Sequence, residues 1–184
     1  DMARAFNLAG ADTKILVFRN NTPQALSDSL AELEKQLKKA QIFALAGGFS
    51  AGDEPDGSGK FIANVLREGR ISEQVMRLLK KRDGLVLGIC NGFQALIKTG
   101  LVPYGEIREP SKEMPTLTFN QVGRHISRIC RTRMVSAISP WSQHPSVVDS
   151  RIHLVPISHG EGRIIINPRL AKELFEKGQI FTQY

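Results

Sequence analysis

Two patterns of apolar and polar residues follow one another along the first half of the chain. Short apolar runs, typical of buried strands, are separated by stretches in which apolar residues recur every three or four positions, as on one face of a helix. The predicted strands are residues 13–18, 42–45 and 85–88, and the predicted helices are residues 22–39, 60–67, 72–81 and 92–99. Strands that alternate with helices indicate βα units on a mostly parallel sheet.

After Pro103 the pattern changes to short strands joined by loops rich in Pro and Ser. The predicted elements there are strands at residues 115–119, 127–134 and 152–157 and a helix at residues 170–177. No internal repeat, low-complexity segment or linker interrupts the chain. The sequence therefore predicts a single α/β domain over residues 1–184, with a doubly wound, mostly parallel sheet flanked by helices and extra strands in the C-terminal half.

The strand at residues 85–88 runs into Gly88-Ile89-Cys90-Asn91-Gly92, which opens the next helix. This G-x-C-x-G turn is typical of a nucleophile elbow, because a sharp strand-to-helix corner has no room for side chains on either side of the nucleophile. Cys90 would stand exposed there, and the amides that open the helix would favour its thiolate. The alternative is that Cys90 is a small buried hydrophobic residue, as free cysteines often are.

A cysteine nucleophile needs a base, and the histidines are His125, His144, His153 and His159. His159 is the best candidate because it follows the strand at residues 152–157, at a strand end where α/β sheets usually present reactive groups. Glu161 lies two residues later. If this piece is extended, both side chains share one face, and the carboxylate can orient the imidazole. A His-x-Glu pair is also common on solvated surfaces, but its pairing with Cys90 predicts a Cys-His-Glu relay.

A glycine-rich loop follows the strand at residues 42–45. Acyl transfer needs donors for the developing oxyanion, and the backbone amides of Gly48 and Asn91 would supply two. A second glycine-rich piece, residues 57–60, resembles a phosphate loop but fails in spacing, because Glu54 stands where the first glycine belongs. The sequence therefore predicts no nucleotide site there.

Three motifs together are similar to the class I (triad) glutamine amidotransferase domain, a flavodoxin-like α/β fold. They are Gly-Gly-Phe-Ser-Ala-Gly-Asp at 47–53, Gly-Ile-Cys-Asn-Gly-Phe-Gln at 88–94 and Ser-His-Gly-Glu-Gly-Arg at 158–163. The similarity runs along nearly the whole chain. Asn91, Phe93 and the Gly-Glu-Gly-Arg tail match the branch that serves purine biosynthesis better than the guanylate, cytidylate or carbamoyl-phosphate branches.

The resemblance implies that Cys90 forms a glutamyl thioester, that His159 is the acid and base, and that Glu161 orients His159. The residues it implies for the oxyanion and the glutamine substrate are Gly48, Asn91, Phe49 and Gln94. L-glutamine is hydrolysed to glutamate and ammonia, and the ammonia passes to an ATP-dependent synthetase domain or subunit. That partner, where ATP and Mg²⁺ are expected, converts formylglycinamide ribonucleotide to the amidine. No cofactor or metal is expected in this domain.

Family members normally carry a further strand before the helix that residues 1–6 continue, and another after residues 181–184. We therefore expect the chain to be the glutaminase part of a longer synthase, without its first strand and its C-terminal end. Two alternatives stay open, another cysteine hydrolase of the same fold and a catalytically silent interaction domain. His159 with Glu161 disfavours the first, and the presence of all three triad residues disfavours the second.

Composition narrows the class of protein. Two cysteines give no disulfide framework, and no signal peptide or apolar run near the ~20 residues of a membrane span is present, so we expect a cytoplasmic protein without membrane association. The net charge of +7 does not indicate nucleic-acid binding, because no aromatic interleaving or binding motif accompanies it. Basic clusters at residues 35–39 and 80–82 fit solvated helix faces. A third, at 124–133, fits a half-exposed strand that faces the synthetase or its anionic substrate.

Overall fold

The computed structural model describes residues 1–48, 59–144, 147 and 152–184. Within it the chain divides into two compact units, Asp1–Pro110 and Ser111–Tyr184. Phe49, which is predicted to help seat glutamine, lies outside the described residues. A single domain over residues 1–184 stays a prediction.

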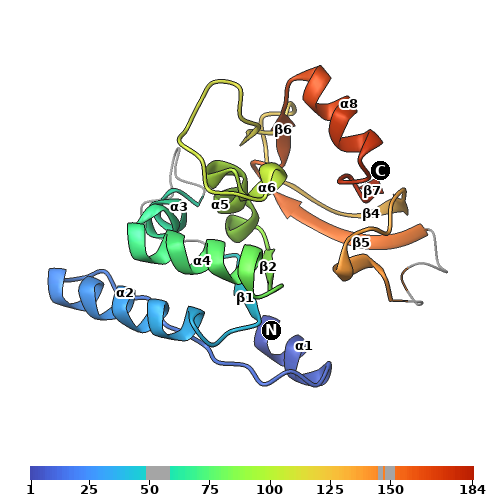
Figure 1. Cartoon of the computed structure of the whole chain (residues 1–184). Helices are drawn as coiled ribbons and strands as arrows, with labels where there is room; N and C mark the ends of the chain where they lie inside the picture. The colour runs from blue at the N-terminus through green and yellow to red at the C-terminus, as the bar shows by residue number, and fades with distance from the viewer. Residues whose placement is uncertain (49–58, 145–146, 148–151) are drawn as a thin grey trace. The chain divides into compact units, whose positions relative to one another are not determined.

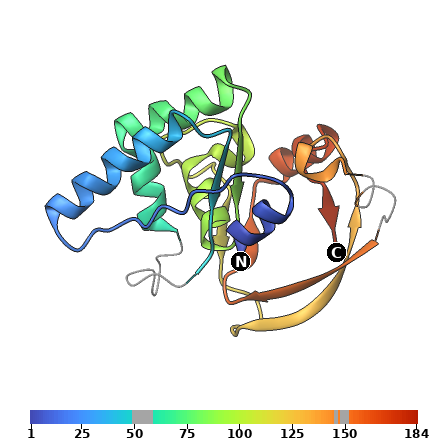
Figure 2. The same cartoon turned by 90° about the horizontal axis from the view of Figure 1, so that it is seen from below.

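The first unit is an α/β unit built around two parallel strands (Figures 1 and 2). Its elements are α1 (Met2–Leu8), α2 (Pro23–Leu37), β1 (Ile42–Leu45), α3 (Lys60–Arg67), α4 (Gly69–Lys81), β2 (Leu85–Gly88), α5 (Asn91–Thr99) and α6 (Leu101–Tyr104). β1 pairs with β2 in parallel from Ile42 opposite Leu85 to Leu45 opposite Gly88. The predicted α/β class and the alternation of strands with helices are confirmed.

Helix α4 begins three residues before the predicted start at residue 72. The reason is a cap, because the Glu68 carboxylate accepts a hydrogen bond from the backbone N–H of Ile71 at 3.1 Å. Helix α2 begins at Pro23, one residue after the predicted start, because Thr22 is its cap: the Thr22 hydroxyl accepts a hydrogen bond from Ala25 N–H at 3.1 Å.

The prediction of a strand at residues 13–18 is wrong, because residues 11–20 form no regular secondary structure. The segment is bound to α2 instead. Ser29 accepts from the backbone N–H of Arg19 at 2.9 Å and donates to its carbonyl oxygen at 3.1 Å. Lys14 bonds Glu32 at 3.0 Å and holds the pKa of that carboxyl below its usual value. A short apolar run therefore does not by itself make a strand, because a strand also needs a partner.

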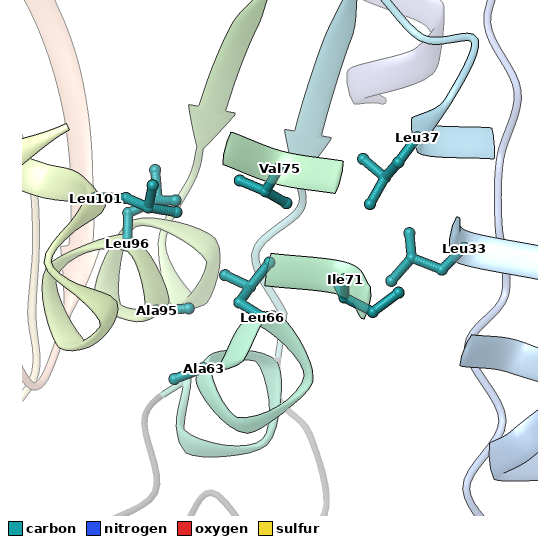
Figure 3. Close-up of a cluster of buried hydrophobic side chains, with 9 residues drawn as sticks. All are labelled: Leu33, Leu37, Ala63, Leu66, Ile71, Val75, Ala95, Leu96 and Leu101. Atoms are coloured by element: carbon teal, nitrogen blue, oxygen red, sulfur yellow. The ribbon is translucent and has the colours of Figure 1, made fainter. Parts of the chain in front are cut away.

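The hydrophobic core of the first unit lies among its helices (Figure 3). Figure 3 shows Leu66 of α3 at the centre of the cluster, between residues of α4 and α5. The buried members are Leu33, Leu37, Ala63, Leu66, Ile71, Val75, Ala95, Leu96 and Leu101, and Phe43, Leu45 and Val86 of the two strands pack against them. This packing fixes the carboxyl ends of β1 and β2 against the start of α5.

In the residues that the structure describes, the second unit has antiparallel sheets and the helix α8. Its elements are β3 (Thr116–Thr118), β4 (Ile126–Met134), the 3₁₀ turn η1 (Pro140–Ser142), β5 (Ile152–His159), β6 (Arg163–Ile165), α8 (Pro168–Glu176) and β7 (Thr182–Gln183). β3 pairs with β6, and β4 lies between β5 and β7, all antiparallel. The predicted extra strands in the C-terminal half are confirmed, and β6 and β7 add to them.

Strand β4 is half-exposed, as predicted for the third basic cluster. Cys130 and Thr132 are buried, whereas Arg131 and Arg133 are exposed.

Among the described residues, no helix is both long and apolar enough to cross a lipid bilayer.

Candidate functional site

Cys90 stands at a strained corner between β2 and α5, and its side chain is exposed. Its backbone has φ +52° and ψ −113°, a left-handed φ that residues with a side chain rarely adopt. Such strain persists only where the surrounding structure imposes it, and it is common at active sites. The predicted elbow with an exposed cysteine is therefore confirmed in its geometry. The thiol donates to the Asn91 side-chain oxygen at 3.9 Å.

The two glycines of the motif allow three chain segments to approach closely. A Cβ atom at Gly88 would lie 2.7 Å from both Leu96 Cδ1 and the carbonyl carbon of Gly92. A Cβ atom at Gly92 would lie 2.7 Å from Leu45 Cβ and would also collide with the Leu45 carbonyl oxygen. Since these contacts are shorter than carbon atoms tolerate, any side chain at either position would push α5 away from the strands.

Gly48 and Asn91, the predicted oxyanion residues, lie side by side. The Asn91 side-chain amide donates a hydrogen bond to the carbonyl oxygen of Gly48. Gly48 has φ +147°, which glycine adopts without cost. The contact follows from the parallel register, since β1 and β2 end opposite each other and Gly48 and Asn91 each lie three residues beyond a strand end. That their amides hold an oxyanion stays a prediction.

Gly47 is a neighbour of Cys90 that sequence reasoning missed. A Cβ atom there would lie 2.6 Å from Cys90 Cβ, 3.1 Å from the Ile89 carbonyl oxygen and 3.5 Å from Cys90 Sγ. Gly47 therefore sets how closely the glycine-rich loop approaches the nucleophile. The signal in the sequence is the doublet with Gly48, one residue after β1, because an oxyanion donor explains only the second glycine of that doublet.

Gly47→Ala should displace Cys90 and lower stability by about 1–3 kcal/mol, the range expected for an extra methyl group in a filled space. Urea unfolding measures the free energy, and the rate of thiol alkylation measures the change at Cys90. Gly69→Ala is the matched control, because no atom lies within 4 Å of a Cβ there. It should be neutral or stabilising by about 0.4–1 kcal/mol. Equal stability and equal thiol reactivity in the two variants would contradict the crowding of Cys90.

Gln94 lies on the first turn of α5, as predicted, and is only 8% exposed. Most of its side chain is therefore packed inside the unit, and a substrate contact would use its small exposed part. Its role with glutamine stays a prediction.

His159 is the last residue of β5, at the predicted strand end. Its Nδ1 atom lies 3.0 Å from Oδ1 of Asn120. A Cβ atom at Gly162 would lie 2.6 Å from Cγ of the imidazole and would collide with Nδ1 and Cε1. Asn120 and Gly162 are thus neighbours of the predicted base that sequence reasoning missed. A buried asparagine must find partners for its amide, but a single sequence does not say which.

Glu161 does not continue the strand. β5 ends at His159, and residues 160–161 form a bend. The condition under which we expected His159 and Glu161 to share one face, an extended chain through both residues, is therefore not met. The bend is fixed by Asn120, whose backbone N–H donates to the Gly160 carbonyl oxygen at 2.9 Å. Glu161 is half-buried, and its role with His159 stays a prediction.

Two other histidines have partners within the second unit. His153 Nε2 donates to the Val147 carbonyl oxygen at 3.0 Å, and His125 Nε2 bonds the Ser158 hydroxyl at 2.8 Å. In the part of the chain that the structure describes, no three His, Cys, Asp or Glu side chains form a group that could hold a metal ion. Cys90 belongs to the first unit and His159 with Glu161 to the second, so their pairing stays a prediction.

Comparison with known proteins gives matches along the whole chain. The family model for the CobB/CobQ-like glutamine amidotransferase domain matches residues 1–184. The phosphoribosylformylglycinamidine synthase subunit PurQ of Dehalococcoides mccartyi is 36% identical over 92% of this chain and 59% of its own length. The PurQ subunit of Treponema denticola is 32% identical over 100% of this chain and 66% of its own length. The chain thus spans about three fifths to two thirds of these relatives.

A solved structure shares the fold. The structure of PurLQS from Thermotoga maritima aligns with a TM-score of 0.52 at 26% sequence identity, over 69% of this chain and 51% of that chain. The predicted resemblance to glutamine amidotransferase domains is confirmed by these matches.

Proposed function

Since this chain belongs to the CobB/CobQ-like glutamine amidotransferase domain family, we propose that it is the glutaminase part of phosphoribosylformylglycinamidine synthase. It hydrolyses L-glutamine and supplies ammonia for conversion of formylglycinamide ribonucleotide to the amidine in purine biosynthesis. The observation that carries the proposal is Cys90, exposed and held at φ +52° between two glycines that admit no side chain. The PurQ relatives support the choice of pathway.

In the first half of the proposed reaction, His159 takes the proton of the Cys90 thiol, and the sulfur attacks the carboxamide carbon of glutamine. The tetrahedral intermediate collapses when the carbon–nitrogen bond breaks. His159 returns its proton to the leaving nitrogen, so ammonia departs and a glutamyl thioester stays on Cys90. Glu161 stabilises the imidazolium that forms in between.

In the second half, His159 takes a proton from water, and the resulting oxygen nucleophile attacks the thioester carbon. The carbon–sulfur bond breaks, glutamate leaves, and Cys90 regains its proton from His159. Both steps place negative charge on the same carbonyl oxygen, where the amides of Gly48 and Asn91 act as donors. The contact between Gly48 and the Asn91 side chain supports this assignment because it holds both residues at one edge. Phe49 and Gln94 help to seat the glutamine.

The ammonia is consumed by a synthetase domain or subunit of the same enzyme, and ATP and Mg²⁺ act there. The likeness to the PurLQS structure supports such a partnership. The exposed Arg131 and Arg133 of β4 face that partner or its anionic substrate, and charge reversal at either should weaken coupling between the two activities. We also propose a cytoplasmic location, because the mechanism needs Cys90 as a free thiol.

The experiment that tests this function is labelling by a diazo-ketone analogue of glutamine, with and without the synthetase. The probe needs both a glutamine pocket and a reactive thiolate, so we expect mass to be added to the peptide with Cys90 and not to the peptide with Cys130. Excess glutamine should block the reaction. No labelling in either preparation, with folding verified, would favour a silent interaction domain. Labelling that glutamine does not block would favour another cysteine hydrolase.

A further inference from the structure

Asn120, in the turn between β3 and β4, is bonded on every side to the backbone around His159. Its side-chain Nδ2 donates to the carbonyl oxygens of His159 at 2.9 Å and Arg124 at 3.0 Å. Its Oδ1 accepts from the backbone N–H of Gly162 at 3.2 Å. Only 8% of the residue is exposed. Asn120 therefore links the turn before β4 to the bend after β5 by hydrogen bonds, and its side chain is largely shielded from water.

These partners decide which end of the Asn120 amide faces the imidazole. Carbonyl oxygens only accept hydrogen bonds, so the NH₂ group must face His159 O and Arg124 O. A backbone N–H only donates, so the oxygen must face Gly162. The amide cannot be turned over without losing all three bonds. Oδ1 is thus the atom 3.0 Å from His159 Nδ1, and because an amide oxygen only accepts, Nδ1 must carry a hydrogen.

We propose that Asn120 is a positioning residue that holds neutral His159 in the tautomer with its hydrogen on Nδ1, which leaves the Nε2 lone pair as the base. This inference rests on the proposed function and deepens it. The proton from the Cys90 thiol then goes to Nε2, and the same Nε2–H is later given to the leaving ammonia. The Nδ1–H bond to Asn120 persists through both transfers, and no proton passes to the amide.

The assignment separates two tasks that a single carboxylate performs in many relays. A neutral histidine in water populates both tautomers, so an unheld ring would present an Nε2–H to the thiol for part of the time. Asn120 removes that unproductive form without adding charge. Glu161 is then needed only as a negative charge that favours the imidazolium, and its position in a bend rather than a strand agrees with that looser requirement.

Nitrogen-15 NMR of the imidazole tests the tautomer on the unmodified protein. The spectrum is recorded near pH 8.5, where histidine is ordinarily neutral, and the His159 signals are identified by their loss in His159→Gln. We expect Nδ1 to give the shift of a protonated ring nitrogen and Nε2 that of an unprotonated one. The opposite pattern would overturn the proposal. This spectrum needs neither activity nor an Asn120 variant, so it decides the tautomer even if the proposed function fails.

Kinetics of the enzyme with its synthetase test the consequence. Asn120→Ala should lower kcat for glutamine hydrolysis about 10- to 100-fold, a part of what acid–base catalysis supplies, with KM changed less than about 2-fold. Asn120→Asp loses the donors to His159 O and Arg124 O but keeps an acceptor at Nδ1. It should recover most of kcat and the wild-type tautomer.

A purely structural role predicts losses of kcat that follow the backbone bonds removed, since Asn120→Asp loses the two contacts to carbonyl oxygens and Asn120→Ala also loses the contact from Gly162 N–H. It predicts the wild-type tautomer in both variants. Equal losses of kcat in the two variants, or the wild-type tautomer in Asn120→Ala, would therefore overturn the proposal. Asn167→Ala is the matched control in the same unit, since it removes the cap of α8, a bond from Arg169 N–H at 2.9 Å, far along the chain from His159. It should keep wild-type kcat. A wild-type enzyme that does not hydrolyse glutamine would refute the proposed function, while the spectrum still decides the tautomer.

Discussion

Cys90→Ala should abolish glutamine-dependent synthesis, by roughly 10⁴-fold or more, while ammonia-dependent synthesis by the same enzyme continues at its normal rate. In the proposed reaction the thiol forms the covalent bond to the glutamyl group, and no other group can replace it. Added ammonia would enter that reaction after the glutaminase step and would not need Cys90. The measurement is the initial rate of amidine formation with saturating glutamine and, separately, with saturating ammonium.

Cys130→Ala is the control for the loss of a thiol. Cys130 lies in β4 and is 7% exposed, so its removal leaves a small cavity that costs about 1 kcal/mol, but both activities should persist. If Cys90→Ala lowered the two rates equally, the defect would lie in folding or in assembly with the synthetase. If it lowered neither, Cys90 would not be the nucleophile, and the elbow would need another explanation.

The elbow was predictable because its cause is local. Gly88 and Gly92 flank Cys90 in the sequence, and the same two glycines are where a Cβ would meet Leu96, Leu45 or the facing backbone. Strand, turn and helix follow one another within a few residues, so local spacing carries the geometry. Helix α2 was predictable for a similar reason, since its Thr22 cap acts on the first turn of the same helix.

Features that depend on distant partners were not predictable. Residues 13–18 include the short apolar run of a strand, yet Lys14 pairs with Glu32 of α2, and the backbone of the next residue, Arg19, bonds Ser29 of the same helix. Asn120 lies 39 residues before His159 and looks like an ordinary turn residue in the sequence. Its importance is visible only when antiparallel pairing of β4 with β5 brings Ile126 opposite His159. Long-range pairing of this kind leaves no pattern in a single sequence.

The candidate base depends on the small size of Gly162 as much as on Asn120. Gly162→Ala should lower kcat for glutamine hydrolysis roughly 10²- to 10³-fold, close to the full contribution of general acid–base catalysis. Because a Cβ there would collide with Nδ1 and Cε1 of His159 and lie 2.6 Å from Cγ, the ring must leave its place beside Asn120. The imidazole can swing away, so the protein should fold with little loss of stability. Steady-state kinetics with glutamine and thermal unfolding measure the two effects.

Gly160→Ala is the matched control two residues earlier, where no atom lies within 4 Å of a Cβ. It changes the same bend by the same methyl group without touching the imidazole, so most of kcat should survive. If both alanine variants lost activity alike, the flexibility of the bend and not the space beside the ring would be what catalysis needs. If Gly162→Ala lost stability but kept kcat, His159 would not be the base. A kcat loss confined to Gly162→Ala, with ammonia-dependent synthesis intact, would tie the defect to the position of the His159 ring.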